Sequence, residues 1–444
     1  MRRALALSVG LAAALASGAA RANPLDTFGF GSRGAAMGGA VTADVHDFSA
    51  GYYNPAGLAG AKSLDLSLGY FAAAHQLSMS GKDNGVDAVR GIVGGLVAPG
   101  KIFGLPFAFG LSLHLPDERL SRVRALRQET PRWELYDNRN QRMYLAANLA
   151  VAPTKWLELG GGVSFMASTD GRLDITGGAN IFNVDSSELR HEVDASLGAI
   201  RYPQFGARVK LPGNLAVTLV YRGEFKLALD IRARLQGDLS GLTTAYYALR
   251  AQTIDAFLPQ QVVLGTSWKP REDLTLNLDF TWINWSAYIP PVAKLDVALD
   301  IPPPAGGWPA GIQPPTTPAP ILVQAMGIHD RLVPHVGAEW KAIAHPRIEV
   351  FVRGGYELAK SPIDEQVRAT NYVDRDRHSF SFGLGARAPK PFGALLGDVR
   401  LDAHVQLSVL PVSLTRKVDA ADFVGDYVAG GQIWNAGATL SVGF

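Results

Sequence analysis

The chain has 444 residues and no cysteine, with 47% hydrophobic residues but only 18% charged ones. The lack of cysteine excludes disulfides, thiolate metal sites, acylation on cysteine and cysteine catalysis. Ordinary soluble domains carry about 25% charged residues, so this deficit indicates that much of the surface does not face water.

The first 22 residues have the pattern of a secretory signal peptide. Arg2 and Arg3 precede the apolar run ALALSVGLAAALA, and Ala20-Arg21-Ala22 is a small-x-small cleavage site. Removing three arginines with residues 1–22 lowers the formal net charge from +2 to −1. No basic excess then remains to indicate nucleic acid as a partner. We expect an exported protein.

Residues 23–62 are rich in glycine and alanine and show no strand-like alternation. They include GFGSRG at 29–34, which matches the dinucleotide-binding pattern G-x-G-x-x-G. No hydrophobic strand precedes this stretch, so the βαβ unit that such a site requires is missing. We interpret residues 23–62 as a plug that cannot fold alone, with Arg33 paired to a carboxylate of the plug or of its surroundings.

From about residue 63 onward, segments of about ten residues alternate apolar with small or polar side chains. The clearest is LTLNLDFTW at 274–282, and the same period of two recurs at 380–388 and 399–409. This period predicts β-strands with one apolar and one polar face. We expect about 14 strands, at roughly 63–75, 87–99, 105–116, 141–152, 156–170, 195–210, 214–229, 259–269, 273–288, 332–343, 347–358, 377–388, 398–410 and 432–444.

The strand and link lengths favour a transmembrane barrel over a soluble sandwich. About 9–11 tilted residues span a bilayer, whereas soluble strands average about 5–6. Tight links such as 153–155 and 270–273 alternate with long ones such as 117–140 and 291–330, as in outer-membrane barrels. The final amphipathic strand ends on Phe444, similar to the C-terminal signal that the bacterial barrel assembly machinery recognises. The predicted fold is all-β: a transmembrane antiparallel β-barrel of about 14 strands with an N-terminal hatch in its lumen.

Two long links have their own character. Residues 239–257 place apolar side chains roughly on one side of a helix, so we predict an amphipathic helix there. Residues 301–320 are proline-rich and predict an irregular or polyproline loop. Either link could pack on its neighbours or offer an apolar landing site to a hydrophobic ligand.

The N-terminal segment carries a more specific signal. The runs GSRGAAMGGA at 31–40 and YNPAGLA at 53–59 resemble the hatch of FadL-type outer-membrane transporters of long-chain fatty acids. Further similar stretches are YRGEFK at 221–226, DFTWINWS at 279–286 and DRHSF at 376–380. The similarity extends over essentially the whole chain after residue 22.

This resemblance implies a signal peptide at 1–22, a hatch at 23–62 and a monomeric barrel at 63–444 in the outer membrane of a Gram-negative bacterium. Extracellular loops would capture a long-chain fatty acid, and movement of the hatch would release it sideways through the wall. Asn54, Pro55 and Ala56 match the hatch motif. Pro106 and Gly110 in the third strand are candidates for a wall opening, because both residues disturb ladder pairing. The expected partners are the ligand, outer-membrane lipid and lipopolysaccharide, and the assembly machinery.

Arg222 and Arg353 should face the lumen by alternation, where either could meet a carboxylate headgroup. The alternative is an internal ion pair with Glu224, Glu349 or Asp279. Aromatic hydrocarbons are a second substrate class, and a general porin or a lipolytic enzyme are further alternatives. We expect no enzyme, because no G-x-S-x-G motif is present and the nine histidines are scattered. The sequence indicates no cofactor and no metal site.

Overall fold

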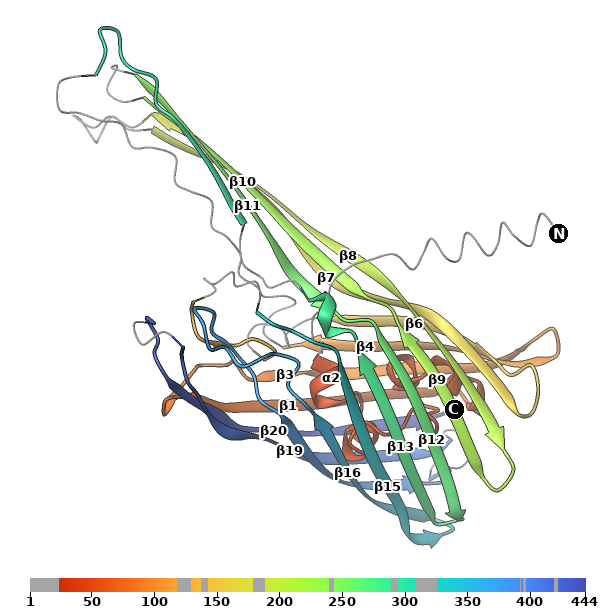
Figure 1. The fold of residues 1–444 in the computed structure, drawn as a ribbon. Coiled ribbons are helices and arrows are strands. Elements are labelled where there is room, and N and C mark those ends of the chain that lie inside the picture. The colour runs from red at the N-terminus through yellow and green to blue at the C-terminus, as the bar shows by residue number, and fades with distance from the viewer. Residues whose placement is uncertain are drawn as a thin grey trace, which may run out of the picture.

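The strands of the protein close into an antiparallel barrel. The computed structural model describes residues 24–117, 129–136, 143–178, 188–238, 243–288, 294–308, 326–391, 393, 397–418 and 422–444. Within these residues fourteen strands form a continuous ladder, which the pairing of β1 with both β20 and β3 closes (Figure 1). The predicted signal peptide at 1–22 lies outside the described residues. No helix among them is long and apolar enough to cross a membrane.

The fourteen barrel strands agree closely with the fourteen predicted segments. They are β1 (Asp65–Met79), β3 (Val89–Ile102), β4 (Leu105–Pro116), β6 (Tyr144–Val151), β7 (Leu157–Gly178), β8 (Glu188–Leu211), β9 (Leu215–Arg222), β12 (Gln261–Arg271), β13 (Leu274–Ile283), β15 (Arg331–His345), β16 (Ile348–Ala359), β18 (Arg377–Ala388), β19 (Val399–Thr415) and β20 (Tyr427–Gly443). The remaining strands are β2 (Lys82–Asp83), β5 (Arg132–Trp133), β10 (Phe225–Asp238), β11 (Thr244–Leu258), β14 (Lys294–Asp300) and β17 (Tyr372–Val373).

Burial along the strands is the reverse of that in a soluble protein. On β13 the polar side chains of Asn277 and Asp279 are 4% and 1% exposed, whereas the apolar side chains of Leu278 and Phe280 are 40% and 38% exposed. The polar face therefore points into the barrel and the apolar face points outward, as expected where the outer surface meets lipid.

The two rims of the barrel differ. Short links such as Phe103-Gly104 between β3 and β4 join strands at one rim, together with the start of β1 and the end of β20. Long connections lie at the other rim, beyond which β7 and β8 continue and β10 and β11 project beside them as part of a separate sheet (Figure 1). We refer to these as the short-turn rim and the long-loop rim.

Two sequence predictions were wrong in this projecting region. The helix predicted at 239–257 is a strand over its described part, because residues 244–258 form β11 and pair with β10 and β14. The strand predicted at 214–229 is interrupted at Gly223, whose N–H donates to the Pro203 carbonyl, so that β9 ends and β10 leaves the barrel. Of the proline-rich link, residues 301–308 are described and form no helix or strand, and residues 309–320 lie outside the described residues.

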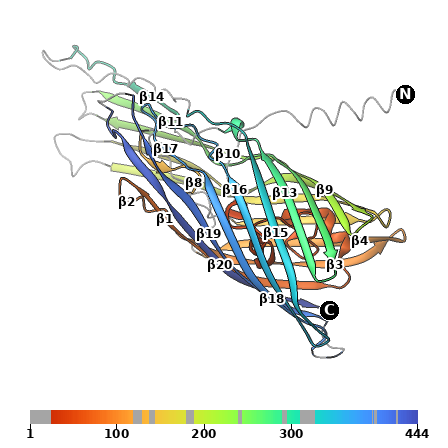
Figure 2. The ribbon, with the colours of Figure 1, turned by 60° about the horizontal axis from the view of Figure 1, so that its bottom comes forward.

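Residues 24–62, here called the lumenal segment, lie inside the barrel. They contain the short helices α2 (Pro24–Phe28), α3 (Ser32–Ala36), α4 (Ala50–Tyr53) and the 3-10 helix η1 (Pro55–Gly60). A second 3-10 helix, η3 (Trp285–Ala287), follows β13. Both ribbon views show the helices of the lumenal segment enclosed by strands (Figures 1 and 2).

Candidate functional site

Inward-pointing side chains of the wall hold the backbone of the lumenal segment. This segment has little regular structure, so many of its backbone carbonyls need partners from outside it. The wall supplies donors from several strands: Ser112 to Phe48 O at 2.6 Å, Tyr144 to Gly51 O at 3.0 Å, Asn277 to Ala40 O at 2.7 Å and Asn435 to Phe28 O at 2.9 Å. The polar inner face of the barrel is thus the hydrogen-bonding partner of the lumenal segment.

Asn54, Pro55 and Ala56 lie together in close contact with the wall. The Asn54 side chain is fully buried, donates to the Thr42 carbonyl at 2.8 Å and accepts from the Ala56 N–H at 3.0 Å. It therefore caps η1, and Pro55 occupies the first turn, where a missing N–H costs nothing.

Glycines of the wall make room for this motif. A Cβ added to Gly206 of β8 would overlap the Asn54 amide oxygen, and one added to Gly160 of β7 would overlap the backbone of Pro55 and Ala56. Other wall glycines face the lumenal segment in the same way: Gly110 faces Leu58, Gly265 faces Thr42, Gly337 and Gly355 face Met37, and Gly383 faces Ala36. We call these seven glycines the glycine seat; the sequence analysis missed it.

The third barrel strand, β4, is fully paired around Pro106 and Gly110. It pairs with β3 from Leu105 to Pro116 and with β6 from Phe107 to His114, without a register shift. The interruption expected at Gly110 is therefore not found in this structure. Instead, the fully buried Leu58 fills the space beside Gly110, where an added Cβ would lie 2.8 Å from both Leu58 methyl carbons.

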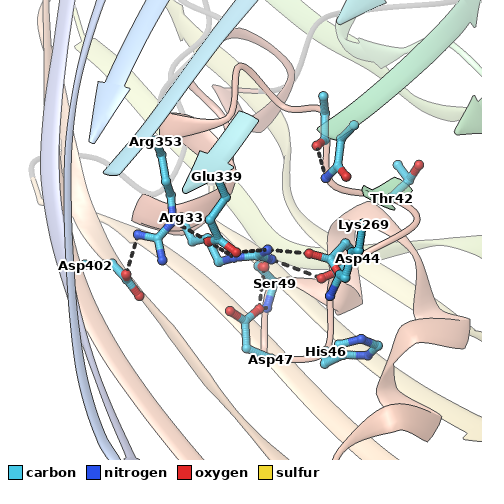
Figure 3. A network of polar contacts seen from close by, with 12 residues as sticks. Arg33, Thr42, Asp44, His46, Asp47, Ser49, Lys269, Glu339, Arg353 and Asp402 are labelled. Atoms are coloured by element: carbon cyan, nitrogen blue, oxygen red, sulfur yellow. Dashed lines mark hydrogen bonds and ion pairs between the residues drawn. The ribbon is translucent and has the colours of Figure 1, made fainter. Parts of the chain in front are cut away.

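Six alternating charges connect the lumenal segment to the wall near the short-turn rim (Figure 3). Four ion pairs bring Arg33 to Asp44 at 2.6 Å and to Glu339 at 2.9 Å, and Arg353 to Glu339 and to Asp402, both at 2.6 Å; in a fifth, Lys269 contacts Asp44 at 2.9 Å. We call Lys269, Asp44, Arg33, Glu339, Arg353 and Asp402 the ionic chain. The expected pairing of Arg33 with a carboxylate is confirmed, with one partner in the segment and one in the wall.

The ionic chain contains one of the two predicted headgroup residues. Arg353 is 4% exposed and faces the lumen, but its partners are Glu339 and Asp402, not the predicted Glu349. Glu349 pairs instead with Arg387 and Lys341. Burial alone would raise the pKa of Asp44, but the Arg33 guanidinium and the Lys269 ammonium hold it well below its usual range. All six residues of the ionic chain line a cavity of about 340 Å³.

Arg222 lies at the end of β9 that is away from the short-turn rim. Its Nε donates to the Tyr52 carbonyl at 2.9 Å, its Nη1 donates to Gln261, and its guanidinium lies over the Tyr52 ring at 4.5 Å. Asp279, a predicted partner, accepts from the Thr42 N–H at 3.0 Å. Arg222 lines a second cavity, of about 50 Å³, together with Arg331 and Arg377.

Packed aromatic rings connect the long-loop rim to the lumenal segment. The aromatic rings of Trp133, Tyr136, His75, Phe28 and Phe71 follow one another with centroid separations of 5.8–6.2 Å. Trp133 and Tyr136 belong to a long connection, whereas Phe28 belongs to the lumenal segment. We call these five residues the aromatic column. Among the described residues, no group of three or more His, Cys, Asp or Glu gathers as metal ligands.

The comparisons agree with this architecture. The chain superimposes on the crystal structure of a Pseudomonas aeruginosa FadL homologue with a TM-score of 0.54 at 16% identity, over 93% of this chain and 97% of that one. The P. putida toluene transporter TodX gives a TM-score of 0.52 at 14% identity, over 94% of this chain and 99% of that one. No curated protein matches the sequence significantly. A family model described as "Outer membrane protein transport protein (OMPP1/FadL/TodX)" matches residues 10–392, so the chain belongs to this family of outer-membrane transporters of hydrophobic substrates.

Proposed function

We propose that this chain carries long-chain fatty acids passively across the outer membrane, with the lumenal segment as its hatch. An acyl chain crosses the polar lipopolysaccharide layer only at a cost of about 0.8 kcal/mol for each methylene exposed to water. A protein-lined apolar path removes that exposure. The aromatic column supplies such a path from the long-loop rim to Phe28 of the hatch.

The observation that carries the choice of a fatty acid is the cavity shared by three arginines. Arg222, Arg331 and Arg377 line one cavity between the hatch and the wall, and Leu25 adds an apolar side. Arg377 is paired with Glu357 through Nη2, and the Nε atoms of both Arg377 and Arg331 have no hydrogen-bond partner among the described residues. A guanidinium with an open donor suits a carboxylate, and a neutral hydrocarbon would gain nothing from it.

The test is direct binding of oleate and of toluene to the purified protein. We expect oleate to bind more tightly than toluene. We expect Arg331→Gln to weaken the binding of oleate roughly tenfold, the effect of about 1.4 kcal/mol, and to leave the binding of toluene unchanged. Arg271→Gln, at an exposed turn beside Asp273, is the matched control and should change neither. Tighter binding of toluene that ignores Arg331→Gln would support the second candidate, an aromatic-hydrocarbon channel.

Release is the last part of the proposal. We propose that movement of the hatch opens a lateral path through the wall, with Asn54, Pro55 and Ala56 as the elements that must leave the glycine seat. The seat supports this role because its contacts are close and lack covalent links, so they can be broken and remade. Pro106 and Gly110 remain candidates for the opening, on condition that Leu58 withdraws from Gly110. Free passage of small sugars with no binding of oleate or toluene would favour the porin alternative.

A further inference from the structure

His46 links the hatch to the wall through both of its ring nitrogens. It lies in the lumenal segment, two residues after Asp44 of the ionic chain. Its Nδ1 lies 2.9 Å from the Gly57 carbonyl oxygen, inside η1, and Nη1 of Arg208 on β8 lies 3.2 Å from its Nε2 and 3.5 Å from its Nδ1. The imidazole thus connects the wall to η1, the 3-10 helix that Asn54 caps and that begins with Pro55 and Ala56.

These two partners fix the protonation state of the ring. A carbonyl oxygen only accepts, so Nδ1 carries a hydrogen and donates it to Gly57. A guanidinium only donates, so Nε2, the nearer ring nitrogen and the one without a hydrogen, is its acceptor. Both contacts exist together only while His46 is neutral. A proton added at Nε2 would remove this acceptor and place a second positive charge directly against the Arg208 guanidinium.

Among the described residues, the carboxylates around the ring are already engaged by other groups. On the hatch, Asp44 is engaged by Arg33 and Lys269, and Asp47 accepts from the N–H and the hydroxyl of Ser49. On the wall, Glu158 of β7 is engaged by Arg208 and Lys210 of β8.

The surroundings of the ring also make its position exact. A Cβ added to Gly60 would lie 2.5 Å from Nδ1, so the ring has little room to turn. Burial and the Arg208 charge lower the pKa of His46. The ring nevertheless lines the cavity of about 340 Å³ near the short-turn rim, which gives protons a route to it; Lys62 lines the same cavity.

We propose that His46 forms an acid-sensitive contact between the hatch and the wall. Protonation at Nε2 breaks its contact with Arg208 and frees η1 from the wall, so that the hatch loosens as the pH falls. This inference deepens the proposed function, because it rests on the hatch being the moving part. The sign follows from linkage. Below the ordinary imidazole pKa of about 6.5, the released hatch takes up a proton that the docked hatch refuses, so docking weakens with falling pH.

The chain has no cysteine, so one engineered thiol reports the state of the hatch. Ser49→Cys is nearly isosteric and its site is 3% exposed, whereas Ser63→Cys at an exposed site corrects for the pH dependence of thiol chemistry. We expect the maleimide labelling rate of Ser49→Cys, divided by that of Ser63→Cys, to rise by roughly tenfold from pH 7.5 to pH 5.

Two further variants, each in the Ser49→Cys background, decide whether His46 is the group responsible. In His46→Gln, the amide can donate to Gly57 and accept from Arg208 without titrating, so labelling should match the unaltered His46 at pH 7.5 and lose its acid response. The control His345→Gln, at an exposed short turn, should keep the full response.

A flat labelling ratio in the Ser49→Cys protein with His46 intact would overturn the proposal, whatever the variants do. An acid response that persists in His46→Gln would also overturn it. If His46→Gln already labels fast at pH 7.5, Arg208→Gln is the variant to use in its place. Without the Arg208 cation, His46 can accept a proton while the hatch stays docked, so the acid response of labelling should shrink. Labelling needs no ligand, so a failure to bind oleate would sink the proposed function and leave this result standing.

Discussion

The lumenal segment is held by different interactions at the two ends of the barrel. Near the short-turn rim, the ionic chain fixes Arg33 and Asp44 to Lys269 and Glu339 with distances of 2.6–2.9 Å. Towards the long-loop rim, Phe28 contacts His75 and Phe71 only through ring packing. Directional charge pairs hold the first end, whereas at the second the side chain of Phe28 is held by apolar ring contacts and its backbone by the hydrogen bond from Asn435.

This difference indicates which end a ligand can change. An acyl chain can replace ring packing at little cost, because hydrophobic contact does not require one partner geometry. It cannot replace a buried ion pair, since removing one charge leaves the other uncompensated. We therefore expect ligand to act first at Phe28 and the ionic chain to stay closed until the whole hatch moves.

The largest expected effect comes from breaking the ionic chain at its centre. Arg33→Met leaves Asp44 and Glu339 without their shared partner, which should cost about 3–5 kcal/mol of hatch docking. Maleimide labelling of Ser49→Cys should become fast in this variant, whereas Phe28→Leu in the aromatic column should leave it slow. Equal labelling in the two variants would show that both ends hold the hatch in the same way.

A smaller effect is expected from filling the glycine seat. Gly206→Ala places a methyl group against the Asn54 amide oxygen, and such overpacking typically costs about 1–3 kcal/mol. The double variant Gly206→Ala with Asn54→Ala should recover part of the loss, although it gives up the η1 cap, worth about 1 kcal/mol. Thermal unfolding of both variants measures the coupling. Strictly additive losses would contradict the contact.

Ionic strength should give the smallest effect. The charges of Asp44 and Arg353 are buried, so salt screens them far less than it screens an exposed pair. Raising NaCl from 0.1 M to 1 M should change the labelling rate of Ser49→Cys less than about threefold, under 1 kcal/mol. A large acceleration by salt would mean that the ionic chain is open to water.

The barrel could be predicted because its strands carry a local signal. The period of two in residues 274–282 and 399–409 reports the two faces of one strand and needs no knowledge of its neighbours. The same reasoning failed at 244–258, where the spacing of the apolar residues suggested one side of a helix. These residues form a strand instead, because they pair with β10 and β14.

The ionic chain depends on register, which a single strand does not reveal. Arg353 was placed correctly in the lumen, but its partner Glu339 is the residue opposite it on the neighbouring strand β15. Its second partner, Asp402, is reached across β18 at Gly385, where an added Cβ would lie 2.5 Å from the Arg353 guanidinium. The glycine seat left a signal in the sequence, since glycines occupy inward positions of several predicted strands. Their common partner, the lumenal segment, is apparent only in the fold.

The most direct test of the account locks the hatch to the wall. The hydroxyl oxygens of Ser32 and Thr439 lie 3.0 Å apart, so Ser32→Cys with Thr439→Cys can form a disulfide between the hatch and β20. Ser67→Cys with Ser441→Cys, whose hydroxyl oxygens lie 2.7 Å apart between two wall strands, is the matched control. We predict that oxidation stops oleate uptake in the first variant alone and that reduction restores it. Unchanged uptake with the hatch locked would contradict the account.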